Sequence, residues 1–305
     1  MKKTIKIATR KSKLALFQAN LVKSQLEKKY PGYEIILNEI ITDGDRHDTI
    51  PLQNIGGKSN FVKALQYELL NEKADIAVHS IKDMAATETE GLMLAAVLQR
   101  EDARDVFVAN RFSNFSALPH YAVIGTASPR RTCLVNAMRP DLKIELIRGN
   151  VDSRLLKLTH KEFDGIVLAA AGLIRLGLSS RICSYFEDDF FTPAIGQGAI
   201  GVECRSDDRV TRELVRFLNH AETEHCVIAE RTVNRVLNGD CHTAIGAHAK
   251  IFHGQMHLSA MVGSLDGKNI LREKMHGDFQ HAKDLGNAVA NALLDKGAKK
   301  IIENK

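Results

Sequence analysis

The sequence predicts an α/β protein with two lobes built on mostly parallel sheets, followed by a small α+β domain at the C-terminus. Strand-like and helix-like segments alternate over residues 4–219, which is typical of parallel sheets with right-handed crossovers. The pattern then changes to one helix and a series of strands, with hairpin signals at 253–254 and 266–267. The length of 305 residues also exceeds what one domain usually holds.

The first lobe is predicted from an ordered run of strands and helices. The strand 4–9 is followed by Ser12, a typical N-cap, and by apolar residues at helical spacing. A second strand at 33–41 leads to the polar, glycine-containing stretch 44–61, whose composition suits a mobile flap over a site. The elements expected next are the helix 61–73 and the strands 74–80, 92–98 and 105–110.

The second lobe repeats this pattern with new residues. We predict strand-to-helix pairs at 121–138, 143–160 and 163–178, then a strand at 196–204 and a helix at 207–219. The last domain is predicted to hold a helix at 223–237, hairpin strands and one closing helix at 282–302.

Composition excludes several classes of protein. Apolar residues make up 44% and charged residues 26%, as in ordinary water-soluble proteins, and no apolar run is long enough to span a bilayer. The net charge of +5, only 6% aromatic residues and no Trp argue against nucleic-acid binding. The N-terminal residues lack the pattern of a signal peptide, and five scattered cysteines without a C-x-x-C pair suit a reducing compartment. We therefore expect a cytoplasmic protein that contacts neither membrane nor nucleic acid.

Arginines stand at the junctions between predicted strands and helices. Ligands of open α/β sheets bind outside the carboxyl ends of the strands, and guanidinium groups there suit carboxylates or phosphates. A single arginine is usually a solvated surface residue, but the set shares one sheet edge in each lobe. The sequence thus predicts a polyanion site formed by Arg10, Arg130, Arg131, Arg148, Arg154 and Arg175.

Lys82 and Asp83 follow the carboxyl end of the buried-type strand 74–80. A carboxylate in that position is a candidate for general acid–base catalysis or for stabilising a developing cation. The alternative is a surface ion pair of little energetic value. His79, inside the strand, is interpreted as a hydrogen-bonded core residue.

Cys241 lies in the stretch NGDCHTAIGAHA, residues 238–249. Its residues alone leave four roles open: nucleophile, metal ligand with His242 and His248, attachment point, or buried packing. The spacing of the cysteine and histidines matches no zinc pattern, so no metal is predicted. A base adjacent in sequence is also not how a Cys–His pair is usually built.

Several segments stand in one order over nearly the whole chain: IATRKSKLAL, DIAVHSIKD, REDARDVF, GTASPRR, RGNVDSRL, AAAGLIRLGL, PAIGQGAIGVECR, AERTVN and GDCHTAIGAHA. Together they resemble the porphobilinogen deaminase (hydroxymethylbilane synthase) family. The resemblance implies a transferase that joins four porphobilinogen units head to tail, releases ammonia and yields hydroxymethylbilane. It also implies a monomer with a covalent dipyrromethane primer and two lobes like those of periplasmic binding proteins.

The resemblance also implies roles for individual residues. Cys241 matches the residue that carries the dipyrromethane cofactor, and Asp83 matches the catalytic aspartate that contacts the pyrrole nitrogens. Cofactor-binding positions are matched by Lys82, Asp83, Ser128, Arg130 and Arg131. Substrate-binding positions are matched by Arg10, Ser12, Phe61, Arg148, Arg154, Arg175 and Gln197.

The chain departs from the family pattern at five positions, and the resemblance also sets the domain boundaries. The departures are Ser59, Ala85, Ala127, Asp240 and His242. The expected domains are 1–97 with 196–216, 98–195, and 217–305. A two-lobed binding protein without catalysis is the rival hypothesis. Asp83 beside Lys82 and the domain that carries Cys241 favour the enzyme.

Overall fold

The computed structural model describes residues 3–40, 59–240 and 242–303. The predicted flap falls largely on residues 41–58, and these residues and Cys241 lie outside the described part. The chain divides into two compact units, Met1–Arg100 with Ala199–Glu224, and Glu101–Gly198 with His225–Lys305. The three domain boundaries drawn from the sequence remain a prediction.

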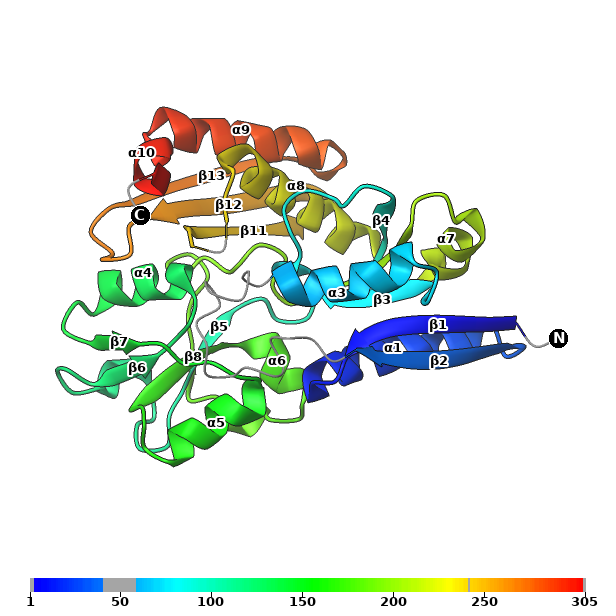
Figure 1. Cartoon of the computed structure of the whole chain (residues 1–305). Coiled ribbons are helices and arrows are strands. Elements are labelled where there is room, and N and C mark those ends of the chain that lie inside the picture. Colours follow the sequence, from blue (N-terminus) through cyan, green and yellow to red (C-terminus); the bar gives the residue numbers. More distant parts are fainter. Residues whose placement is uncertain (1–2, 41–58, 241, 304–305) are drawn as a thin grey trace. The chain divides into compact units, whose positions relative to one another are not determined.

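The first unit is built on a five-stranded mixed sheet in the order β2-β1-β3-β10-β4 (Figure 1). The strands β1 to β3 pair in parallel, whereas β10 runs antiparallel to both β3 and β4. The strands are β1 (Lys3–Arg10), β2 (Tyr33–Ile40), β3 (Ile76–Ser80), β4 (Leu92–Val97) and β10 (Ile200–Arg205). The helices are α1 (Lys13–Lys29), α3 (Ser59–Leu70) and α7 (Arg209–Val215).

The core of this unit lies between α1 and the sheet. Ser12 begins α1 as predicted, because its hydroxyl accepts a hydrogen bond of 3.3 Å from the Ala15 amide and satisfies one of the unpaired donors at the helix start. Val22 and Leu26 on α1 are fully buried with Ile7 of β1. Burial of these side chains fixes the sheet and therefore the edge at which β1 and β3 end.

The second unit contains another five-stranded mixed sheet, in the order β7-β6-β8-β5-β9. Here β6 pairs in parallel with β7 and β8, and β5 runs antiparallel to β8 and β9. The strands are β5 (Asp105–Val108), β6 (Val123–Gly125), β7 (Lys143–Glu145), β8 (Gly165–Ala169) and β9 (Ser184–Tyr185). The helices are α4 (Pro129–Met138), α5 (Val151–Thr159) and α6 (Ala170–Arg175).

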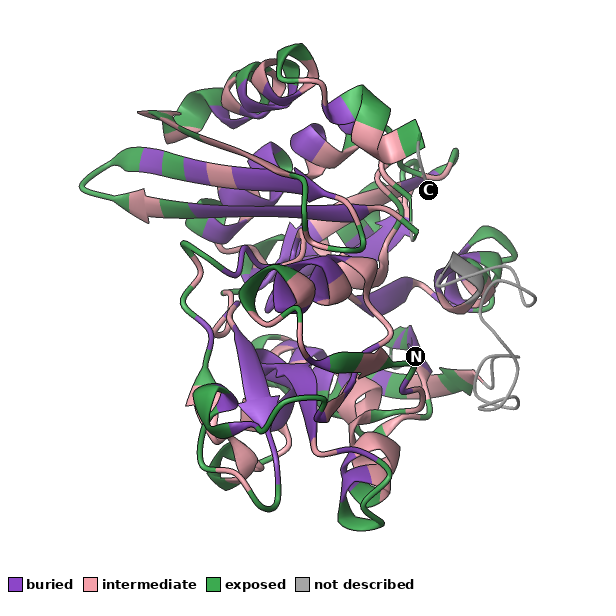
Figure 2. Ribbon diagram, turned by 90° about the vertical axis from the view of Figure 1, so that its left-hand side faces the viewer, coloured by how far each residue is buried: buried purple, intermediate pink, exposed green. Residues whose placement is uncertain are grey.

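The same unit holds a three-stranded antiparallel sheet, β11 (Ala244–Phe252), β12 (Gln255–Gly263) and β13 (Ile270–Asp278). One face of this sheet packs against α8 (Ala221–Leu237), α9 (Ala282–Asp295) and α10 (Ala298–Glu303), and α4 contacts β11. Figure 2 shows buried residues along β11 and β12. The α/β class with a small α+β part at the C-terminus is therefore confirmed.

Two details correct the predicted elements. The single closing helix is wrong, because Gly297 adopts φ +97° and separates α9 from α10. A residue in the left-handed region ends an α-helix, and glycine reaches that region without a Cβ penalty. The turn predicted at 253–254 is confirmed, since His253 and Gly254 both have positive φ, the requirement of a two-residue type I′ hairpin.

Candidate active site

In the first unit, the predicted site residues gather at the carboxyl ends of β1 and β3. Arg10 is the last residue of β1, and Asp83 ends the short 3₁₀ helix Ile81–Asp83 that follows β3. Because β1 and β3 are parallel neighbours, both residues follow the same edge of the sheet. The Arg10 guanidinium lies 3.9 Å from the ring centroid of Phe61, so the structure brings these two predicted site residues together in a cation–π contact.

Lys82 and Asp83 stand on a turn that is fixed by its backbone. The Ile81 amide donates to the Ala199 carbonyl at 3.1 Å, and the Met84 amide donates to Ile81 at 3.0 Å. Ile81 itself is buried, while Lys82 and Asp83 are half-buried. The carboxylate is therefore held on a rigid support with part of its surface open to solvent.

His79 belongs to a buried polar network behind this turn. Its Nε2 lies 3.1 Å from Glu203 Oε2, and Glu203 Oε1 accepts a 2.9 Å hydrogen bond from Gln66. The interpretation of His79 as a hydrogen-bonded core residue is confirmed. The network ties α3 to β3 and β10.

In the second unit, six predicted residues follow three neighbouring parallel strands. Ser128, Arg130 and Arg131 come after β6, at the start of α4. Arg148 and Arg154 follow β7. Arg175 ends α6, which follows β8 directly. The carboxyl edge of this sheet therefore carries the arginines as predicted.

Arg130 and Arg131 converge on one buried carboxylate that the sequence analysis missed, Asp105. Arg130 Nη1 donates to Asp105 Oδ2 at 2.7 Å, and Arg131 Nε donates to Oδ1 at 2.9 Å. Asp105 is 0% exposed, and both arginines are also buried. Gln197 completes the arrangement, since its Nε2 donates to Asp105 Oδ1 at 3.1 Å and to the Ala103 carbonyl at 2.6 Å.

Charge explains why this carboxylate stays ionised. Burial by itself would raise the pKa of Asp105, but the positive charges of Arg130 and Arg131 outweigh burial and lower the pKa to about 2. One carboxylate shared by two guanidinium groups offsets one of their two positive charges. Asp105 is the first residue of the apolar strand β5. An acidic residue at the start of a strand is usually interpreted as part of a turn, so only its presence in the segment REDARDVF could have indicated a buried role.

Two of the remaining arginines are held by backbone carbonyls. Arg154 Nε donates to the Gly149 carbonyl at 2.8 Å, and Arg175 Nη2 donates to the Gly198 carbonyl at 2.7 Å. Burial lowers the pKa values of Arg148 and Arg175. Both nevertheless stay charged at neutral pH, because a guanidinium is not deprotonated in proteins. These contacts orient fixed positive charges along the edge.

Asp240, one of the departures from the family pattern, is hydrogen-bonded to the residues that precede β11. Asp240 Oδ1 accepts hydrogen bonds from the His242 amide at 2.9 Å and from the Thr243 hydroxyl at 2.6 Å. His242 is exposed. An aspartate that bonds the backbone two residues on is an Asx turn. Thr243 and Asp240 thus fix the turn that leads into β11.

Over 3–40, 59–240 and 242–303, no group of three His, Cys, Asp or Glu side chains could hold a metal ion. No helix in those same ranges is long and apolar enough to cross a membrane.

Comparisons with known proteins match nearly the whole chain. The family model described as "Porphobilinogen deaminase, dipyromethane cofactor binding domain" matches residues 5–213, and the C-terminal domain model of the same family matches 224–295. A porphobilinogen deaminase of Coxiella burnetii is 51% identical over 301 residues, which cover 99% of this chain and 97% of that protein.

Among solved structures, the chain is similar to a methionine-binding lipoprotein of Bacillus subtilis (TM-score 0.47, 13% identity, 72% of this chain and 91% of that one). It is also similar to a periplasmic substrate-binding protein of Coxiella burnetii (TM-score 0.46, 12% identity, 70% of this chain and 91% of that one).

The fold is that of an α/β protein in which each compact unit carries basic side chains beyond the carboxyl ends of its parallel strands. The chain belongs to the porphobilinogen deaminase family. The resemblance inferred from the sequence is therefore confirmed. With it are confirmed the transferase activity, the polymerisation of porphobilinogen to hydroxymethylbilane and the dipyrromethane cofactor.

Proposed function

We propose that this chain makes hydroxymethylbilane with Cys241 as the attachment point of the primer, Asp83 as the catalytic carboxylate and the arginines as carboxylate-binding groups. The observation that carries the proposal is the buried cluster of Arg130, Arg131 and Asp105. Each porphobilinogen brings two carboxylates, so a growing chain accumulates negative charge that guanidinium groups neutralise.

The residues present fit a carboxylated primer. Arg130 Nε is buried and has no hydrogen-bond partner among the described residues, although its Nη1 is bonded twice. A buried donor without a partner costs free energy, and a carboxylate oxygen would relieve that cost. When bound, dipyrromethane supplies the terminal pyrrole to which substrate units are added. Ser128, Arg130 and Arg131 would hold its carboxylates, together with Lys82.

Asp83 acts on the charge that develops when ammonia leaves the substrate. Departure of ammonia makes the pyrrole ring electron-poor, and a carboxylate beside the ring N–H lowers the free energy of that positive charge. The same carboxylate then accepts a proton, as a general base, when the ring recovers its aromaticity. The rigid backbone of the 81–84 turn keeps the carboxylate in place without reorganisation.

The substrate groups are assigned to the remaining residues. Arg10, Ser12, Arg148, Arg154 and Arg175 would bind acetate and propionate side chains. The Arg10 guanidinium over Phe61 presents an edge of N–H donors beside an aromatic face, which suits a carboxylated pyrrole. Gln197 would act through Asp105, because its amide nitrogen is bonded there.

We also propose that the protein is a cytoplasmic monomer that binds neither membrane nor nucleic acid, with the three domains 1–97 plus 196–216, 98–195 and 217–305. Cys133, Cys183 and Cys204 form no disulfide, which suits a reducing compartment. The monomer and the domain boundaries rest on the resemblance to the family.

Intact-mass measurement tests the attachment. The wild-type chain should carry an added mass equal to two porphobilinogen-derived pyrroles, and Cys241→Ser should lack it. Cys183→Ser serves as the matched control and should keep the added mass. An unmodified wild-type chain that forms no hydroxymethylbilane would refute the proposal.

The role of Asp83 has its own test. Asp83→Asn keeps the shape but removes the charge, so we expect retained primer, retained porphobilinogen binding and a loss of turnover of about a hundred-fold or more. Single-turnover kinetics and intact mass measure the two effects separately. Turnover at the normal rate would show that the role assigned to Asp83 is wrong.

A further inference from the structure

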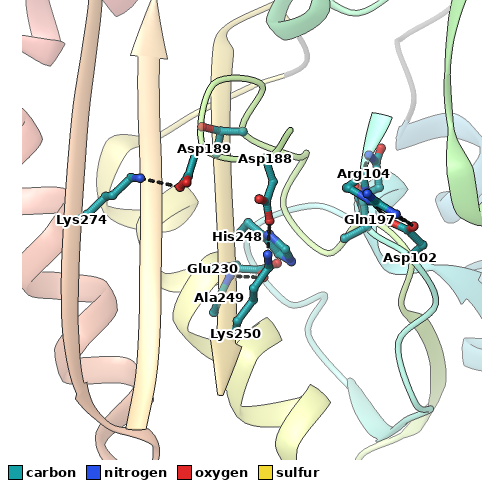
Figure 3. Close-up of polar contacts among 12 residues, drawn as sticks. Asp102, Arg104, Asp188, Asp189, Gln197, Glu230, His248, Ala249, Lys250 and Lys274 are labelled. Carbon is teal, nitrogen blue, oxygen red and sulfur yellow. Dashed lines mark hydrogen bonds and ion pairs between the residues drawn. The ribbon is translucent and has the colours of Figure 1, made fainter. Parts of the chain in front are cut away.

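The connecting segment 188–192 is bound by side chains of the C-terminal sheet. His248 Nδ1 of β11 lies 3.2 Å from Asp188 Oδ2, and Lys250 pairs with the same carboxylate. Lys274 of β13 lies 2.5 Å from Asp189. Figure 3 shows these side chains of β11 and β13 directed toward the segment. Asp188 is therefore held by two basic groups of one strand.

Arg272 of β13 binds the end of this segment. Its Nη2 donates to the Phe190 carbonyl at 2.7 Å, and its Nη1 donates to the Thr192 hydroxyl at 3.1 Å. Thr192 is 2% exposed. The last residue of the segment is thus buried and fixed to the sheet through its side chain.

The backbone of Thr192 bonds to the arginine pair. Arg130 Nη1 donates to the Thr192 carbonyl at 2.7 Å and to Asp105 Oδ2 at the same distance. Thr192 therefore accepts one hydrogen bond from the sheet and one from Arg130. Thr192, a single buried residue, thus links Arg272 of β13 to Arg130 by hydrogen bonds.

Gly246 of β11 packs closely against both Arg130 and the backbone of residues 192–193. A Cβ at Gly246 would lie 2.9 Å from the Pro193 carbonyl oxygen and 3.0 Å from both Arg130 Cδ and the Thr192 carbonyl oxygen. Two of these three atoms belong to the backbone, which yields far less easily than a side-chain end. Only glycine lets β11 approach Arg130 and Thr192 together.

We propose that Gly246 is a positioning residue that sets Arg130 through Thr192. Strand β11 begins three residues after Cys241 in the sequence, and its Gly246 lies beside Arg130. This inference rests on the proposed function of Arg130 in binding the primer. Gly246 has no side chain with which to bind a ligand, and it acts through Arg130.

Gly246→Ala tests the proposal, with Gly277→Ala as the matched control. A Cβ at Gly277, in β13, would meet only Leu285 Cδ1, at 3.6 Å, and Cδ2, at 4.0 Å, which is ordinary contact. We expect Gly246→Ala to raise KM for porphobilinogen about ten-fold to a hundred-fold, with a smaller change in kcat, because a displacement near 1 Å has such effects. Intact mass should show a larger fraction of chains without dipyrromethane. Gly277→Ala should match wild type in both.

Thr192→Val keeps the proposal testable if Gly246→Ala does not fold. It removes the hydroxyl that accepts a hydrogen bond from Arg272 and keeps the carbonyl that accepts one from Arg130. KM should therefore rise and primer loading should fall, as in Gly246→Ala, but by smaller factors. A Gly246→Ala protein with a lower melting temperature but wild-type loading and KM would overturn the proposal. So would wild-type values in Thr192→Val. A wild-type chain without primer would instead refute the proposed function.

Discussion

At the scale of single residues, Asp105 fixes the orientation of the Arg130 and Arg131 guanidinium groups. Its carboxylate accepts from Arg130, Arg131 and Gln197 while wholly buried. Removing one partner of a buried charged cluster leaves the others desolvated and unpaired, which is more costly than the loss of a surface pair. The residue thus supports the proposed binding site from within the core.

Asp105→Asn should lower the free energy of unfolding by about 3 kcal/mol at neutral pH, because two buried guanidinium groups lose their counter-charge. Denaturant unfolding measures the difference. The pKa of about 2 lies below the ordinary 3.8, so the ionised carboxyl stabilises the folded state above about pH 4, and this contribution is lost as pH falls through 2.

The difference in the free energy of unfolding between wild type and Asp105→Asn should accordingly be largest near neutral pH and become smaller toward pH 2. Asp207→Asn is a suitable control, because Asp207 is exposed and lies in the first unit. A gap that stays constant from pH 7 to about pH 2 would contradict the account of Asp105.

At the scale of elements, the pattern of apolar residues located strands and helices but not their directions. In both five-stranded sheets one strand, β10 or β5, runs antiparallel to its neighbours. A buried strand has the same apolar composition in either direction. Direction depends on where the chain enters the sheet, which local composition does not encode.

Gly297→Ala should lower the free energy of unfolding by about 1 kcal/mol and leave KM and kcat unchanged. The reason is backbone strain alone, since Gly297 has φ +97° and a Cβ there meets nothing within 4 Å. Gly32→Ala is the control: it has the same open surroundings without a left-handed backbone, so its stability should stay within about 0.5 kcal/mol of wild type. Equal losses in both variants would refute the strain argument.

At the scale of the whole molecule, charge and core extend beyond single elements. One apolar core joins residues of the second five-stranded sheet, such as Phe107, to Met261 of β12 through Cys133 and Leu134 of α4. This continuity is why the α4 arginines and the C-terminal sheet belong to one compact unit. The predicted domains 98–195 and 217–305 both contribute residues to this core, and their boundary remains a prediction.

Binding of the substrate should depend on ionic strength across the whole protein. Arginines at the strand ends of both units attract carboxylates, and salt screens that attraction. We expect KM for porphobilinogen to rise about three-fold between ~0.05 M and ~0.5 M potassium chloride, with a smaller change in kcat. Sucrose at matched osmolality should have no such effect. A KM that does not change with salt would argue against binding through guanidinium groups.

The sequence by itself determined the family, the α/β class, the arginines at strand ends and the Lys82–Asp83 turn. The family follows from the resemblance of many segments in one order, and the other features follow from apolar periodicity and the ends of predicted strands. Only the tertiary structure decided that Asp105 lies between two arginines and that Gly246 leaves room for Arg130 beside Thr192. These contacts join residues from 25 positions apart, Asp105 and Arg130, to 116 positions apart, Arg130 and Gly246, and such pairing is set by packing and desolvation in the folded chain.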